Sequence, residues 1–368
     1  MRYSNQLISM AILFFASLFL TGCENKQSEK EPDSTAGSTH ETEILLRYLE
    51  ENGDIINDKT IPYFVTAPEL YTHLKASNYH IIDVRTPREF KRGHIENAVN
   101  IQPENVLHYF ENKIEPNSFE KIAIVCGNSQ LSGYVTLILR LLGYNNTYNL
   151  KFGMSSWDQE LARRYWWANI SNDLVGLLDV KDYPQNEPGK LPAINTGKNS
   201  GYEILRARAQ EALNINWDEV SIDYIELWEN PEDYYIVNYW PEALYNMGHL
   251  PTAVQYDPKK SLHSNEDIYT LPTDKPIVTY CFTGQNASYV SGFLSVLGYQ
   301  FRNLDYGANT FMHETLRQTQ TKASRWFQEM HVSDFPVSRK HLAPNANNSG
   351  QDTVPKETVE STTVQGGC

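Results

Sequence analysis

The chain has 368 residues, of which 31 are Lys or Arg and 45 are Asp or Glu, so its formal net charge is −14 at pH 7. Nucleic acids and anionic lipid surfaces repel such an acidic chain, which argues against both as partners. The length accommodates two domains of ordinary size, and four cysteines are too few to indicate a disulfide framework.

Residues 1–22 have the pattern of a targeting segment. Arg2 precedes an uncharged apolar run over residues 7–20, which is short for a membrane-spanning helix. The following Leu20-Thr21-Gly22-Cys23 resembles a bacterial lipoprotein signal, which implies that Cys23 is acylated and becomes the N-terminus. We therefore expect a cell-envelope protein that lipid alone anchors to a bacterial membrane, on the periplasmic or surface side. The alternative is an ordinary secretory signal or an uncleaved anchor.

A tether and a first domain follow. Residues 23–60 are mostly polar, with one short helix predicted over residues 43–51. Residues 61–170 form the first domain, in which Thr66 is placed to cap a helix and residues 80–84 read as a buried strand. The aromatic run over residues 165–167 is typical of packing at the end of a domain.

Cys126 is the residue of this domain that suggests chemistry. The apolar run over residues 122–125 leads into it, and a loop and a helical pattern ending at Gly143 follow. A cysteine just before a helix N-terminus is well placed to act as a thiolate. Lowering a cysteine pKa from ~8.5 by about two units takes roughly 2.7 kcal/mol, and a helix dipole supplies at most ~2 kcal/mol. We therefore expect N–H groups of the loop to supply the rest.

The second half repeats the first. Residues 171–214 read as a linker and a helix, and residues 215–330 as a second domain. Cys281 lies 155 residues after Cys126, and Gly248-His249 follows Gly93-His94 at the same spacing. Matches in one register indicate a duplication. We expect each domain to fold independently around its own core.

The remaining features carry little chemistry. Residues 331–368 are predicted to be a disordered tail, which ends in Cys368 as a free thiol. No His or Cys cluster has the spacing of metal ligands, so neither a metal nor another cofactor is expected.

The motifs of both halves resemble the rhodanese, or sulfurtransferase, domain. The resemblance covers about residues 61–167 and 217–325, and it weakens in the second half, where Asn238-Tyr239-Trp240 replaces Asp83-Val84-Arg85. It implies an α/β fold with two tandem rhodanese-like domains, each a central parallel sheet flanked by helices. The motifs are Ile81-Ile82-Asp83-Val84-Arg85, Arg88-Glu89-Phe90, Gly93-His94-Ile95, a strand-borne cysteine, Phe152-Gly153-Met154 and Trp157.

The resemblance also implies a function. Rhodaneses take a sulfane sulfur onto the loop cysteine as a persulfide and pass it to an acceptor, which would make Cys126 and Cys281 catalytic. By the same resemblance His94 and His249 are structural, and Asp83 with Arg85 braces the fold. The implied substrate-binding loops consist of Gly127, Asn128, Ser129, Gln130, Leu131 and Ser132, and of Phe282, Thr283, Gly284, Gln285, Asn286 and Ala287.

Neither loop contains an Arg or Lys, which many active rhodaneses use to hold an anionic donor. We therefore expect small-molecule or protein persulfides to donate sulfur better than thiosulfate does, with a thiol as acceptor. Two alternatives stay open, a catalytically weak scaffold that binds a partner protein and a thiol redox sensor. A phosphatase is disfavoured because Ser132 and Ala287 stand where it needs an Arg six residues after the cysteine.

Overall fold

The computed structural model describes residues 39–319, 322 and 325–339. The predicted signal segment, the lipidation site Cys23 and the terminal Cys368 lie outside these residues. Of the helices in the described residues, none has the length and apolar character needed to cross a bilayer.

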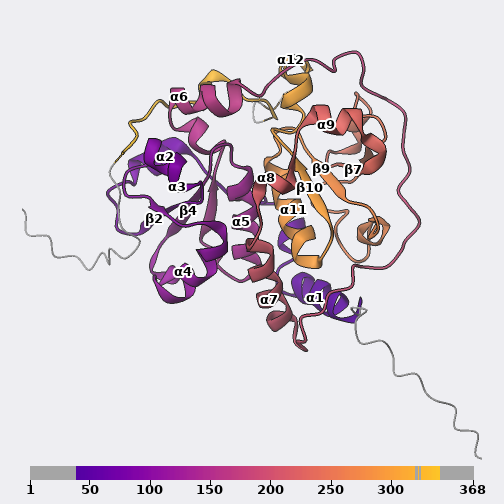
Figure 1. Cartoon of the computed structure of the whole chain (residues 1–368), viewed down its shortest axis with the longest axis horizontal. Helices are drawn as coiled ribbons and strands as arrows, with labels where there is room; N and C mark the ends of the chain where they lie inside the picture. Colours follow the sequence, from indigo (N-terminus) through magenta and orange to yellow (C-terminus); the bar gives the residue numbers. More distant parts are fainter. Residues whose placement is uncertain (1–38, 320–321, 323–324, 340–368) are drawn as a thin grey trace, which may run out of the picture. The chain divides into compact units, whose positions relative to one another are not determined.

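Two five-stranded parallel sheets form the frame (Figure 1). Their strand orders are β1-β5-β4-β2-β3 and β6-β10-β9-β7-β8, so equivalent parts of the repeat take equivalent places. This arrangement confirms the predicted fold class. The strands are β1 (Phe64–Val65), β2 (Tyr79–Asp83), β3 (Val99–Asn100), β4 (Lys121–Val125), β5 (Thr147–Leu150), β6 (Ser221–Ile222), β7 (Tyr235–Asn238), β8 (Val254–Gln255), β9 (Ile277–Tyr280) and β10 (Phe301–Leu304).

Helices flank each sheet, as expected for parallel strands that must be covered on both faces. Residue Thr66 caps α2 as predicted, because its hydroxyl accepts a hydrogen bond from Glu69 N at 3.3 Å. The helices are α1 (Thr39–Glu51), α2 (Ala67–Thr72), α3 (Pro87–Arg92), α4 (Val106–Asn112), α5 (Gln130–Leu141), α6 (Gln159–Ala162), α7 (Gly201–Leu213), α8 (Trp217–Val220), α9 (Tyr224–Glu229), α10 (Glu242–Tyr245), α11 (Gln285–Leu297) and α12 (Asn309–Thr319).

The helices that follow the two cysteine loops, α5 and α11, pack against each other between the sheets (Figure 1). Their backbones approach so closely that a Cβ at Gly133 would lie 2.4 Å from the Ser288 hydroxyl oxygen. The Tyr134 hydroxyl donates across this contact and lies 2.8 Å from Ser295 Oγ. One hydrophobic cluster therefore runs through both domains. Each domain also has an apolar cluster of its own, as expected, but the two domains are not separate, because each long helix buries nearly all its residues and packs on the other.

The segment that follows each domain in the sequence packs on the other domain. After the first domain, Leu174 enters the core of the second, and Asp179 forms an antiparallel bridge with His249. After the second domain, Ser338 forms the equivalent bridge with His94. We call residues 171–183 and 331–339 the exchanged straps.

The second strap corrects the predicted tail. Residues 331–339 are not a disordered segment, since Phe335 stacks on Tyr71 with ring centroids 3.9 Å apart and Val337 joins the same apolar cluster. Backbone hydrogen bonds hold the strap as well, with Ser333 N 2.9 Å from Ser156 O. Its apolar side chains Val332, Phe335 and Val337 lie among charged and polar residues in sequence, so the overall composition of the segment does not reveal them.

Candidate functional site

Cys126 lies where β4 ends, at the carboxyl edge of the first sheet, and its loop curls around the sulfur. The N–H groups of Ser129 and Ser132 point at Sγ from 3.2 and 3.4 Å. The Ser132 hydroxyl oxygen lies 3.1 Å from Sγ and 2.7 Å from Asn149 Oδ1, and with one proton it donates to one of them at a time. The loop thus forms the predicted cradle of hydrogen-bond donors for a negative sulfur.

The electrostatic balance at the sulfur differs from the sequence expectation. Burial raises the pKa of the Cys126 thiol, and the Ser132 hydroxyl with the N–H groups of Ser132, Asn128 and Ser129 offsets only part of that rise. The cradle therefore reduces the cost of forming the thiolate but does not fully compensate for the burial of the sulfur.

A cleft of about 340 Å³ opens beside Cys126 and is lined by both domains. The first domain contributes Gly127, Asn128 and Leu131 from the loop, which are the loop residues that reach the cleft, while Ser129, Gln130 and Ser132 lie buried behind them. From the second domain come Trp217, Asp218, Ser221, Asp305 and Tyr306. The site is thus composite, although each half of the repeat was expected to build its own.

Arg85 lines the same cleft and also braces the fold. Its guanidinium donates to both carboxylate oxygens of Asp83, with Nη2 2.6 Å from Oδ2, and to Gly93 O at 2.9 Å. The third nitrogen, Nη1, is buried without a hydrogen-bond partner. The predicted bracing pair therefore forms, and the charge of Arg85 also acts on the neighbouring Tyr165.

Two glutamines join the cysteine loops across the domain boundary. Gln130 Oε1 accepts from Tyr306 N at 3.0 Å, and its Nε2 donates to Leu304 O at 3.1 Å. At the equivalent place Gln285 Oε1 accepts from Phe152 N at 2.9 Å. Each loop is thus fixed in part by backbone of the other domain. Their equal positions in the repeat are the one sequence signal for this pairing.

Cys281 occupies the matching place after β9, but its surroundings are closed. Burial raises the pKa of its thiol, and N–H groups of Ala287, Thr283, Asn286 and Gly284 counteract this in part. In place of Arg85, Trp240 stacks on Phe282 with ring centroids 4.4 Å apart. A cavity of about 10 Å³ lies beside this loop; its lining is Ile56, Ile61, Tyr239, Pro258, Lys259 and Asn286, and does not include Cys281.

The other predicted residues take structural places. His94 and His249 are buried, and each has its Nδ1 2.9 Å from the carbonyl oxygen four residues earlier, at Phe90 and Tyr245. Among the residues that the structure describes, no group of three His, Cys, Asp or Glu is arranged to hold a metal ion.

Sequence reasoning missed Tyr165, which it assigned to packing. The residue lies in a π-helical turn, Arg163–Trp167, lines the Cys126 cleft and donates its hydroxyl proton to Glu89 Oε1 at 2.7 Å. Its neighbour Trp166 is fully buried and does pack as predicted. Both residues lie in this turn, of a kind that is frequent at functional sites, so no signal in the aromatic run separates them and only the lining of the cleft does.

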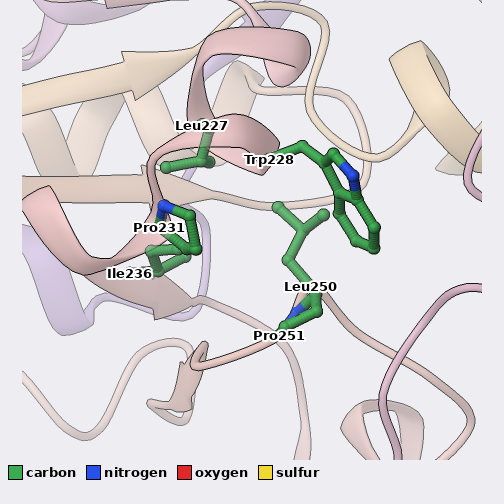
Figure 2. A pocket seen from close by; sticks show the side chains of 6 residues that line it. All are labelled: Leu227, Trp228, Pro231, Ile236, Leu250 and Pro251. Atoms are coloured by element: carbon green, nitrogen blue, oxygen red, sulfur yellow. The ribbon is translucent and has the colours of Figure 1, made fainter.

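Another pocket lies on the second domain, but no reactive group lines it. Its volume is about 50 Å³, and Figure 2 shows Trp228 and Leu250 facing each other across it. All of its lining side chains are apolar: Leu227, Trp228, Pro231, Ile236, Leu250 and Pro251. The Cys126 cleft, with a nucleophile, donors and charges together, is the candidate active site.

Comparisons with known proteins identify the family of the chain. A model of the rhodanese-like domain matches residues 66–160 and 223–314, about half of the chain. The uncharacterized protein YqhL of Bacillus subtilis is 40% identical over 84 residues, which are 23% of this chain and 64% of YqhL. The thiosulfate sulfurtransferase GlpE of Shewanella oneidensis is 27% identical over 94 residues, 26% of this chain and 90% of GlpE.

Among solved structures, that of SseA from Escherichia coli, described as a 3-mercaptopyruvate sulfotransferase, is 19% identical. The match covers 66% of this chain and 97% of SseA, with a TM-score of 0.25. The two regions that the model of the rhodanese-like domain matches overlap the two parallel sheets and include both cysteine loops. The chain therefore belongs to the rhodanese-like domain family and contains two such domains.

Proposed function

We propose that this protein is a sulfurtransferase that carries sulfur as a persulfide on Cys126 and passes it to a thiol acceptor. The observation that carries the proposal is the contrast in access: Cys126 opens on a cleft of about 340 Å³, whereas about 10 Å³ adjoins the second loop. Both sequence-predicted cysteines have a donor cradle, and Cys126 itself lines the larger cleft, whereas Cys281 is not in the lining of the small cavity beside its loop. Cys281 then keeps a structural role in the apolar cluster of the second domain.

The chemistry follows from the cradle. The Cys126 thiolate attacks the outer sulfur of a donor R–S–SH, the S–S bond of the donor breaks, and R–S⁻ leaves with the bonding electrons and takes up a proton. The N–H groups of Ser129 and Ser132, at 3.2 and 3.4 Å, stabilise the negative sulfur before the attack. An acceptor thiolate then attacks the outer sulfur of Cys126–S–SH, and Cys126 leaves as the thiolate.

Intact-mass measurement after treatment with a sulfane-sulfur donor tests the assignment. Wild type and Cys281→Ser should gain about 32 Da, one sulfur atom, which dithiothreitol removes, and Cys126→Ser should gain nothing. Sulfur carried by Cys281 alone would contradict the assignment. No sulfur on either cysteine, together with capture of a partner protein, would favour the binding scaffold instead.

We further propose that the chain is lipid-anchored through Cys23, with the Leu20-Thr21-Gly22-Cys23 pattern as support. A Cys23→Ser variant should be released from membranes or remain unprocessed. A processed Cys23→Ser protein that still sediments with membranes would overturn this proposal.

A further inference from the structure

The charges around Cys126 are mostly negative. Four carboxylates line the cleft, Glu89 and Glu104 from the first domain and Asp218 and Asp305 from the second. Among the residues that the structure records in this lining, Arg85 is the one cation, and Asp83 already pairs with it. The cleft as a whole therefore repels an anionic reactant and attracts a cationic one.

The carboxylates of the second domain are crowded. Asp305 is partly exposed to the cleft, and burial, the nearby Asp223 and then Asp218 raise its pKa to about 7, while a hydrogen bond from Ser221 acts the other way. An ammonium group placed between Asp305 and Asp218 would relieve this repulsion. Asp218 itself is exposed, so solvent screens it more than it screens Asp305.

The one cation of the lining is not free to hold an anion. The Arg85 side chain is 3% exposed, and its guanidinium already donates to both carboxylate oxygens of Asp83 and to Gly93 O. The carboxylates therefore dominate the charge that a reactant meets in the cleft.

We infer that the acceptor at Cys126 is an amino thiol, a small thiol that bears an ammonium group, as cysteamine, cysteine or an N-terminal cysteinyl peptide does. This inference rests on the proposed function. The ammonium group faces Asp305 and Asp218. The thiolate of the acceptor attacks the outer sulfur of Cys126–S–SH, a new S–S bond forms, the old one breaks, and its electrons stay on Cys126.

The test uses the full-length protein, loaded with one sulfur at Cys126, and follows the loss of about 32 Da by mass as thiols are added. Cysteine and 3-mercaptopropionate form one pair of probes, which differ by the ammonium group, and cysteamine and 2-mercaptoethanol form a second, in which an ammonium group replaces a hydroxyl. The ratio of rates within a pair is compared between the wild type and the double variant Asp218→Asn, Asp305→Asn. This comparison cancels the intrinsic reactivity of each thiol.

The ratio should fall at least about fivefold in the double variant, and added salt should lower it in the wild type. A control with the same change in charge, Glu96→Gln with Glu187→Gln, removes two exposed carboxylates outside the cleft lining and should leave the ratio unchanged. A ratio that is equal in the wild type and the double variant overturns this inference alone. Failure of every donor to load Cys126 overturns the proposed function, and this inference with it.

Discussion

The two cysteine loops have the same backbone construction and different access. Both follow a central strand, both curl N–H groups around a buried sulfur, and both are tied to the opposite domain by a glutamine. The two sites differ at four pairs of equivalent positions. Val84, Arg85, Glu104 and Leu131 line the first cleft, and the residues 155 positions later, beside the second loop, are Tyr239, Trp240, Lys259 and Asn286.

The difference teaches that the cradle for a sulfur and the space for its reactants are set by different residues. Hydrogen bonds within the loop make the cradle, and the duplication preserved them. Residues from the neighbouring turns and from the other domain decide whether anything can reach the cysteine, as Ile56 and Ile61 do at the second site. A cysteine loop alone is therefore weak grounds for expecting turnover.

The largest effect is expected when the two domains are separated. A fragment over residues 61–170 should lose cooperative unfolding altogether, because it exposes the face of α5 that packs on α11 and lacks the strap with Phe335. Thermal or urea unfolding followed by circular dichroism measures this, and a fragment over residues 39–339 serves as the control. A sharp transition in the shorter fragment would restore the prediction of independent domains.

The rates of alkylation measure how accessible the two cysteines are. With iodoacetamide and mass spectrometry of peptides, Cys126 should react at least about tenfold faster than Cys281, whose modification needs local opening. The rate at Cys126 should rise as the pH increases from about 7 to 9, because only the thiolate reacts and burial raises its pKa.

A swap between the two sites provides the matched variant for that measurement. Tyr239→Val places the first-domain residue at the second site and should speed alkylation of Cys281 severalfold. In urea both cysteines of the wild type should react alike. Equal rates in the native wild type would mean that the first cleft gives no advantage.

Substitution of the two glutamines that join the loops should have the smallest effect of these changes. Gln130→Ala removes hydrogen bonds with Asn128 Nδ2, Tyr306 N and Leu304 O, whereas Gln285→Ala removes the one with Phe152 N. We expect Gln130→Ala to lower the free energy of unfolding by about 2–4 kcal/mol and Gln285→Ala by about 1–3 kcal/mol, since each leaves a buried N–H unpaired. Sulfur loading of Cys126 should slow more in Gln130→Ala. The reverse order in urea unfolding would contradict the assigned contacts.

Much of the fold could be predicted from the sequence because its signals are local. Apolar runs before Cys126 and Cys281 indicated buried parallel strands, and the 155-residue offset placed both in equivalent sheets. The cysteine cradle was predicted for the same reason. The pKa of Cys126 could not be predicted from the cradle, because the cost of burying the sulfur depends on packing by residues outside the loop.

The composite character of the site could not be predicted from one repeat unit. Nothing in the spacing of Asp305 and Cys126 indicates that they line one cleft, since the contact depends on how two domains pack. The pattern of α5 gave no warning either: Ser132, Thr136 and Arg140 form a polar stripe along it, as on a surface helix, yet the structure buries all three.

The exchanged straps impose an order of events on the making of this protein. The first domain is not complete until Phe335 and Val337 have been synthesised, since they fill a gap beside Tyr71 and Gly93. A ribosome that has finished the first sheet at Leu150 still has 185 residues to add before Phe335 is made and that gap can close. The nascent first half therefore stays unfinished through most of translation, which suits a chain whose N-terminal segment resembles an export signal.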